Sequence, residues 1–178
     1  MLKKDIFMTG YTNQPDYIKR RVSFLLNEAK NNSPRDQAIT YVMRVLSNYA
    51  SVGFDGTSQA IKKRNCNISQ ASYIKLKNAT SLNDWSINTI NEHPVPLKFT
   101  WNWIIQNSLS LTEDVIWNHF VTNPMVTILK AEDKALNANG LRAISDVARY
   151  EKVGIKVIAL DKIPELIFKE NLRGITHE

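Results

Sequence analysis

The sequence predicts a mainly helical α+β protein, in which an N-terminal helical module precedes a smaller module with a few short strands. Two observations predict this class. Apolar residues recur at a helical spacing through much of the first half of the chain, whereas short β-branched or alternating runs occur at 85–91, 123–129 and 155–160. With 178 residues and a hydrophobic content of 43%, the chain is long enough to bury a core of its own.

Charge is distributed unevenly along the chain. The net charge is +6, but residues 1–80 contain thirteen Lys and Arg against five Asp and Glu, a balance of +8, whereas residues 81–178 have a balance of −2. We therefore expect a basic helical module over residues 1–82 and a second, strand-containing module over residues 83–178. A basic surface attracts polyanions, so the first module is the candidate for binding a nucleic acid.

The sequence also indicates a compartment. No apolar run approaches the length of a membrane span, and residues 1–5 lack the apolar segment of a secretory signal. Cys66 is the single cysteine of the chain, so it has no partner for an internal disulfide. These features favour a cytoplasmic protein that does not insert into a membrane.

Two helices are expected before residue 53. Apolar spacing predicts the first over residues 16–31, and Ser33 and Pro34 are typical of the cap and first turn of the second. The two helices are expected to pack as an antiparallel pair. Their apolar stripes are Ile18, Val22, Leu25, Leu26 and Ala29 in the first helix, and Ala38, Tyr41, Val42, Val45, Leu46 and Tyr49 in the second.

Residues 57–77 predict two short basic helices around a polar turn at residues 65–67. A helix-turn-helix DNA reader has the same arrangement, although no residues suited to reading bases are evident here. Lysine and arginine contact phosphates without reading sequence, so we expect phosphate contacts from this segment and from the helix expected over residues 141–152. The residues assigned to these contacts are Lys62, Lys63, Arg64, Lys75, Lys77 and Arg142, with Arg149 also available.

An acidic residue and a histidine lie side by side at the end of the alternating segment 85–91. Glu92 and His93 are followed by Pro94 and Pro96, which do not fit the interior of a central strand. The two polar residues are therefore expected at a strand end. Beyond them the sequence predicts, in order, a helix over 97–107, a helix that begins after Thr112, a strand over 123–129, an acidic helix over 130–140, a helix over 141–152, a strand over 155–160 and a helix from Pro164 to about Asn171.

The segment from residue 85 to residue 140 resembles the HNH, or ββα-metal, endonucleases. In that family the first strand ends in an acidic-His or His-His pair with a proline-containing exit, an Asn opens the second strand, and a metal-binding His, Asn or Asp lies on the following helix. The matching residues are Glu92, His93, Asn123 and Asp133. The resemblance implies that the second module is a small ββα-metal-like module.

The resemblance also implies a function, a metal-dependent endonuclease that hydrolyses phosphodiester bonds in DNA. On this reading His93 is the general base that activates water, and Asn123 orients the histidine or braces its loop. Glu92 and Asp133 hold a divalent cation, Mg²⁺ or Mn²⁺, because Mg²⁺ prefers hard oxygen ligands. The cation would neutralise the charge that builds up on the phosphate.

Two other functions are compatible with the same sequence. A non-catalytic DNA-binding protein would need the basic residues Lys62, Lys63 and Arg64 but would be indifferent to His93. An interaction protein, such as an inhibitor of another protein, would need neither. The endonuclease would fit restriction or phage and mobile-element biology, and the two alternatives would fit a phage or mobile-element origin. The sequence does not fix the oligomeric state, and a homodimer is compatible with it.

Aromatic residues in the expected helices over 97–122 also leave two roles open. Trp101 and Trp103 are suited to stacking on bases or to packing in a core. His119 lies near a helix C-terminus, where the dipole favours an imidazolium, or it joins the site of His93.

Overall fold

The computed structural model describes residues 10–145 and 147–175. The chain forms two compact units, each made of two separate stretches. The helical unit comprises Met1–Asp55 and Val95–Pro124, and the mixed unit comprises Gly56–Pro94 and Met125–Glu178. The fold is α+β and mainly helical, as the sequence predicts. The boundary expected at residue 82, however, lies inside the mixed unit.

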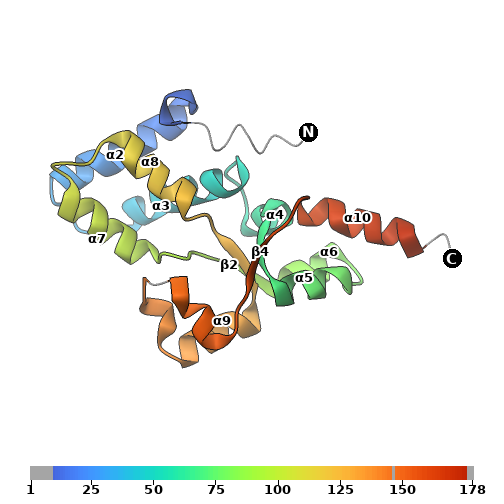
Figure 1. Cartoon of the computed structure of the whole chain (residues 1–178). Coiled ribbons are helices and arrows are strands. Elements are labelled where there is room, and N and C mark those ends of the chain that lie inside the picture. Colours follow the sequence, from blue (N-terminus) through green and yellow to red (C-terminus); the bar gives the residue numbers. More distant parts are fainter. Residues whose placement is uncertain (1–9, 146, 176–178) are drawn as a thin grey trace. The chain divides into compact units, whose positions relative to one another are not determined.

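Four helices form the main part of the helical unit described by the structure (Figure 1). The chain enters this unit twice, so its second helix pair is inserted between two strands of the mixed unit. Apolar stripes of all four helices bury one core, which includes Trp101 and Trp117. The elements are the short 3-10 helix η1 (Tyr11–Asn13), α2 (Asp16–Lys30), α3 (Gln37–Val52), α7 (Leu97–Asn107) and α8 (Glu113–Thr122).

Several helix positions of this unit differ from the sequence-based expectation, among them Ala38 of the expected apolar stripe, which is exposed. Asp36, not Ser33, caps α3, because its side chain accepts a hydrogen bond from the Ile39 amide at 2.8 Å. Tyr41 lies on the outer face of α3 with 57% of its surface exposed, although its spacing placed it on the apolar stripe. Val115, expected to pack inward, is also exposed.

The mixed unit contains a four-stranded sheet within the described part of the chain, with the strand order β2-β3-β1-β4. β1 is parallel to β3 and antiparallel to β4, and β2 is antiparallel to β3. Ile128 on β3 lies in a buried cluster with Leu136 and Tyr150. The strands are β1 (Asn67–Ser69), β2 (Thr89–Glu92), β3 (Val126–Leu129) and β4 (Val157–Ala159).

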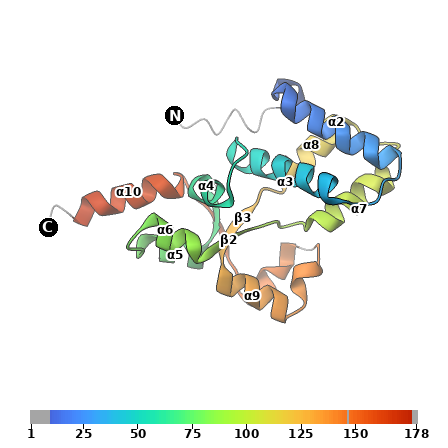
Figure 2. The same cartoon turned by 180° about the vertical axis from the view of Figure 1, so that it is seen from behind.

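The helices of this unit differ from the sequence-based expectation in two segments. The segment expected to be a strand over 85–91 is helical up to Ile87, and the strand begins only at Thr89. The helix expected over 141–152 is a series of short 3-10 helices instead. Figure 2 shows α10 beside α4 and α5. The elements are α4 (Ser58–Arg64), α5 (Gln70–Lys77), α6 (Leu82–Ile87), α9 (Lys130–Ala138), η2 (Leu141–Ala143), η3 (Val147–Arg149), η4 (Glu151–Val153) and α10 (Pro164–Ile175).

None of the helices in residues 10–145 and 147–175 combines the length and the apolar content of a membrane span.

Candidate functional site

Strands β2 and β3 and helix α9 follow the strand, strand, helix order that the sequence predicts, and we call them the ββα element. The strands pair in antiparallel register, with Glu92 opposite Val126. α9 starts directly after β3, and its start is fixed by Glu132. The Glu132 Oε2 atom accepts hydrogen bonds from the Leu129 amide at 2.7 Å and from the Ser69 hydroxyl at 2.6 Å. Glu132 therefore links α9 both to the end of β3 and to Ser69 on β1.

Glu92 ends β2 and is only 8% exposed. Its Oε1 atom accepts a hydrogen bond from Arg149 Nη2 at 2.5 Å, and its Oε2 atom accepts one from the Tyr150 hydroxyl. Burial raises the pKa of the Glu92 carboxyl, while the Tyr150 hydroxyl and the Arg149 charge act to lower it. Both oxygens of Glu92 are thus already engaged by side chains of the same unit.

Arg149 supplies the positive charge at the centre of this cluster. Its side chain is fully buried, which is rare for arginine, and its Nε atom is buried without a hydrogen-bond partner among the described residues. Besides Glu92, the guanidinium donates to the carbonyls of His93 at 2.7 Å, Leu141 at 3.2 Å and Arg142 at 3.1 Å. The sequence offered Arg149 for phosphate contact, but its buried position makes it a structural cation.

Asp133, the second carboxylate of the implied metal site, lies on α9 with its side chain 17% exposed. Its Oδ1 atom is buried without a hydrogen-bond partner, and the Arg142 Nε atom lies 3.6 Å away. The charge of Asp133 contributes to raising the pKa of Glu92, so the two carboxyl groups are close enough to repel each other. The structure therefore brings these predicted ligands into one neighbourhood, each with an arginine partner.

Arginines beside Glu92 and Asp133 compete for the carboxylates with the divalent cation that the resemblance implies. Mg²⁺ and Mn²⁺ need carboxylate oxygens with lone pairs free to face the ion, in a near-octahedral arrangement. Each Glu92 oxygen already accepts one hydrogen bond, from Arg149 or from Tyr150, so a cation would have to share the carboxylate with these two donors. Within the part of the chain that the structure describes, no three His, Cys, Asp or Glu residues gather as a possible metal site. The cation that neutralises Glu92 is a guanidinium.

The two residues expected to act in catalysis lie in different units. His93 follows β2 in the mixed unit, is half-buried, and has its carbonyl anchored by Arg149. Asn123 ends α8 in the helical unit, where its Nδ2 atom donates to the His119 carbonyl at 2.8 Å. Asn123 therefore caps the C-terminus of α8. The side chain that contacts the His93 backbone is that of Arg149.

Lys62 was expected to contact phosphate, but its ammonium group is enclosed by the mixed unit. Its Nζ atom donates to the carbonyls of Ser86 at 2.8 Å and Thr89 at 2.7 Å. Burial lowers the pKa of this lysine. The ammonium ties α4 to the start of β2 and is not available to a phosphate.

Three of the other expected phosphate contacts, Lys75, Lys77 and Arg142, have side-chain partners. Lys75 lies 3.9 Å from Asp84, and the Lys77 ammonium lies 5.8 Å from the centre of the Tyr73 ring. A hydrogen bond from Lys169 lowers the pKa of Glu165 on α10, and the charges of Arg64 and Lys63 act in the same direction. Lys63 and Arg64 belong to the expected set, and Arg142, which lies beside Asp133, completes it. Among the described residues, ion pairs engage five basic side chains of this unit: Lys75, Arg142, Arg149, Lys162 and Lys169.

The segment from α4 to α5 does not form a helix-turn-helix. Its central residues make strand β1, which pairs with β3 on one side and β4 on the other. Asn65 is fully buried and hydrogen-bonds the Met125 carbonyl, so the polar turn belongs to the interior. This segment consists of helix α4, strand β1, which belongs to the sheet, and helix α5.

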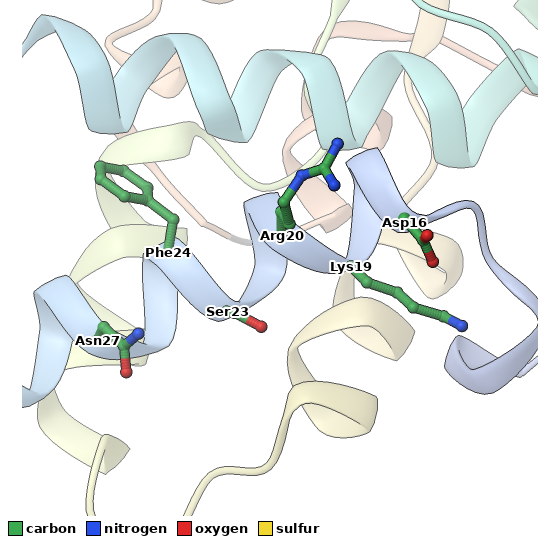
Figure 3. A pocket seen from close by; sticks show the side chains of 6 residues that line it. All are labelled: Asp16, Lys19, Arg20, Ser23, Phe24 and Asn27. Carbon is green, nitrogen blue, oxygen red and sulfur yellow. The ribbon is translucent and has the colours of Figure 1, made fainter.

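Cations without an ion pair to a described acid also lie on α2, just before α3 and on α3 of the helical unit. Lys19, Arg20, Arg35 and Arg44 make no ion pair with any acidic residue that the structure describes. Two of them, with a half-buried phenylalanine, line a hollow along α2 (Figure 3); its lining residues are Asp16, Lys19, Arg20, Ser23, Phe24 and Asn27. The other two line a second hollow at the start of α3 with Asp36, Gln37, Thr40 and Tyr41.

The aromatic residues of α7 and α8 pack within the helical unit. Trp101 is buried in the core, and Trp103 stacks on the His119 ring with 4.5 Å between ring centres. The His119 Nε2 atom lies 3.2 Å from the Thr100 hydroxyl, and burial lowers the pKa of His119, which favours the neutral ring. These contacts account for His119 without a role beside His93.

Comparison of the chain with family models, curated proteins and solved structures found no match. The argument for function therefore depends on the chain's own residues. Sequence reasoning missed the burial of Arg149, the four cations Lys19, Arg20, Arg35 and Arg44, and the exposed Tyr41. The last had a local signal, because Tyr41 and Arg44 are three residues apart and therefore share a helix face.

Proposed function

We propose that this chain is a non-catalytic nucleic-acid-binding protein that contacts phosphates through α2 and α3 of the helical unit. The observation that carries the proposal is a set of cations on α2, just before α3 and on α3 that make no ion pair with any described acid: Lys19, Arg20, Arg35 and Arg44. Cations that protein carboxylates leave unpaired are the ones free to replace the counterions of a phosphate backbone. The overall charge of +6 adds long-range attraction for the same polyanion.

The geometry of the ββα element supports a structural role for it. Glu92 and Asp133 are neutralised by arginines, and the most buried of these, Arg149, has four acceptors in hydrogen-bond contact. A buried ion pair of this kind is difficult to open, because breaking it leaves an uncompensated charge in the interior. On this proposal the element holds the mixed unit together and performs no chemistry.

Neutralising the four unpaired cations is expected to weaken nucleic-acid binding strongly. The variant Lys19→Gln/Arg20→Gln/Arg35→Gln/Arg44→Gln removes four phosphate contacts, so the slope of log affinity against log salt should fall by about 3. Fluorescence anisotropy with labelled duplex and single-stranded DNA, over a series of salt concentrations, measures this slope.

A matched control changes the net charge by the same amount at cations that already have partners. The variant Lys75→Gln/Arg142→Gln/Lys162→Gln/Lys169→Gln removes four ion-paired side chains of the mixed unit. We expect its salt slope to stay close to that of the wild type. Equal losses in the two quadruple variants would show that only net charge matters, and absence of binding by the wild type at low salt would contradict the proposal itself.

DNA hydrolysis is a second candidate function, and one observation favours it. The strand, strand, helix order is present, with His93 directly after β2 and Asp133 on α9. In this reading the His93 imidazole would accept a proton from an attacking water. Because Glu92 is fully engaged by Arg149 and Tyr150, no step of such a reaction can be assigned to it.

We expect the wild type to bind DNA without cutting it, because both carboxylates near His93 are paired with arginines. Supercoiled plasmid and single-stranded DNA are incubated with the wild type and with His93→Ala, each in Mg²⁺, Mn²⁺ or EDTA, and the products are separated by electrophoresis. Intact DNA in all arms agrees with the first proposal. Metal-dependent cutting by the wild type that disappears in His93→Ala would overturn it and establish the hydrolase.

A further inference from the structure

The hollow at the start of α3 combines two guanidinium groups with an exposed aromatic ring. Its volume is about 570 Å³, and its lining residues are Arg35, Asp36, Gln37, Thr40, Tyr41 and Arg44. Asp36 is the single acid among them, and its Oδ1 atom accepts a hydrogen bond from the Ile39 amide as the cap of α3. The hollow therefore has a positive balance of charge.

Tyr41 is the unusual member of this group. More than half of its surface is exposed, at 57%, on a helix whose other face is buried in the core. Its ring stacks on no other aromatic ring among the described residues, whereas Tyr17 and Tyr49 of the same unit pack against each other. An exposed tyrosine offers a flat π face at little entropic cost, because it has only two side-chain torsions.

The positions of the two arginines suit a chain of phosphates passing the ring. Arg44 lies three residues after Tyr41 and therefore on the same helix face, and Arg35 lies just before the helix begins. Guanidinium groups bind phosphates with paired hydrogen bonds, and neither arginine is committed to a carboxylate in the part of the chain that the structure describes. Cation, aromatic ring and cation are thus arranged along one surface.

We infer that this hollow binds single-stranded nucleic acid, with one base stacked on Tyr41 and the flanking phosphates on Arg35 and Arg44. The inference rests on the proposed nucleic-acid binding and adds the strandedness of the ligand. Charge complementarity selects a polyanion, and the exposed ring selects one with accessible base faces. A duplex keeps its bases stacked on each other, so it offers the phosphates but not the base.

Replacing Tyr41 by alanine tests the stacked base. We expect Tyr41→Ala to weaken binding of a labelled oligothymidylate by about 5- to 150-fold, the range that loss of one base-aromatic stack produces. Binding of a labelled duplex should be unchanged. Tyr41→Phe, which keeps the ring and loses the hydroxyl, should bind the oligothymidylate like the wild type.

Anisotropy titrations of the full chain separate this inference from the proposal beneath it. If the wild type binds neither the oligothymidylate nor the duplex, the proposed function fails. If the wild type binds both and Tyr41→Ala binds the oligothymidylate equally well, only the inference fails. Polyglutamate is added as a competitor for an acidic protein partner. Competition by polyglutamate as strong as that by unlabelled oligothymidylate would also overturn the inference, because the bases would then contribute nothing. A thermal melt of each variant confirms that the exposed substitution leaves the fold intact.

Discussion

Replacing Arg149 by alanine is expected to lower the free energy of unfolding by about 3–5 kcal/mol. The reason is the network around its buried guanidinium, which donates to Glu92 Oε1 and to three backbone carbonyls. Alanine would leave the Glu92 carboxylate in the interior without its counter-charge and the carbonyls without donors. Urea unfolding followed by circular dichroism measures the change.

Arg142→Ala is the matched control, because Arg142 is a neighbouring arginine whose side chain is 56% exposed and pairs with Asp133. The Arg142 guanidinium is mostly in solvent and lies 3.6 Å from Asp133, so its loss should cost clearly less stability than the loss of the buried Arg149. Adding Glu92→Gln to Arg149→Ala should recover part of the loss, since a neutral amide costs less to bury than a carboxylate. Similar losses in Arg149→Ala and Arg142→Ala would contradict the central role of Arg149.

The helices could be predicted from the sequence because their signals are local. In α2, apolar residues recur every three or four positions, and in α8 the Thr112 hydroxyl accepts a hydrogen bond from the Val115 amide as the expected cap. Such patterns depend on residues within one or two turns of each other. They therefore specify a helix whatever it packs against.

In the segment 85–91 the local pattern fits both a strand and a short helix. Trp85 and Ile87 alternate with polar residues as in a strand, but so short a run also fits one helical turn. Ser81 resolves the ambiguity, because its side chain accepts a hydrogen bond from the Asp84 amide and so starts α6. A serine followed three residues later by an acid was the available signal, and it predicts a helix start.

The surroundings of Glu92 could not be predicted, because they depend on contacts far apart in sequence. Glu92 was correctly expected at a strand end, but Arg149 lies 57 positions away in a series of 3-10 turns that was expected to be a regular helix. Nothing in the local sequence distinguishes a buried arginine from a solvated one. The same holds for Lys62, whose two acceptors lie 24 and 27 positions away.

The division into two units was hidden for a similar reason. No change of composition marks the point after Asp55 or after Pro94, where the chain passes from one unit to the other. An apolar stripe shows that a helix has a buried face but does not show which helix covers it. The pairing of α2 and α3 with α7 and α8 is therefore a result of packing, not of local pattern.

Asn65→Ala is expected to lower the free energy of unfolding by about 2–4 kcal/mol, because it leaves several buried polar groups without partners. The Asn65 amide donates to the Met125 carbonyl at 2.9 Å and to the Thr127 hydroxyl at 3.1 Å, and its oxygen accepts from the Asn67 amide at 3.1 Å. These bonds join the start of β1 to β3 beside their parallel pairing. Urea unfolding measures the loss.

Asn78→Ala supplies the control, since Asn78 is exposed at the end of α5 and its removal should change stability by no more than about 0.5 kcal/mol. Hydrogen exchange then locates the effect. If Asn65 holds β1 in the sheet, amides of β1 should exchange faster in Asn65→Ala, while those of the antiparallel β2–β3 pair keep most of their protection. Uniformly faster exchange in all four strands would mean instead that the sheet opens as one unit. If Asn65→Ala lowers the free energy of unfolding no more than Asn78→Ala does, Asn65 does not hold β1 in the sheet.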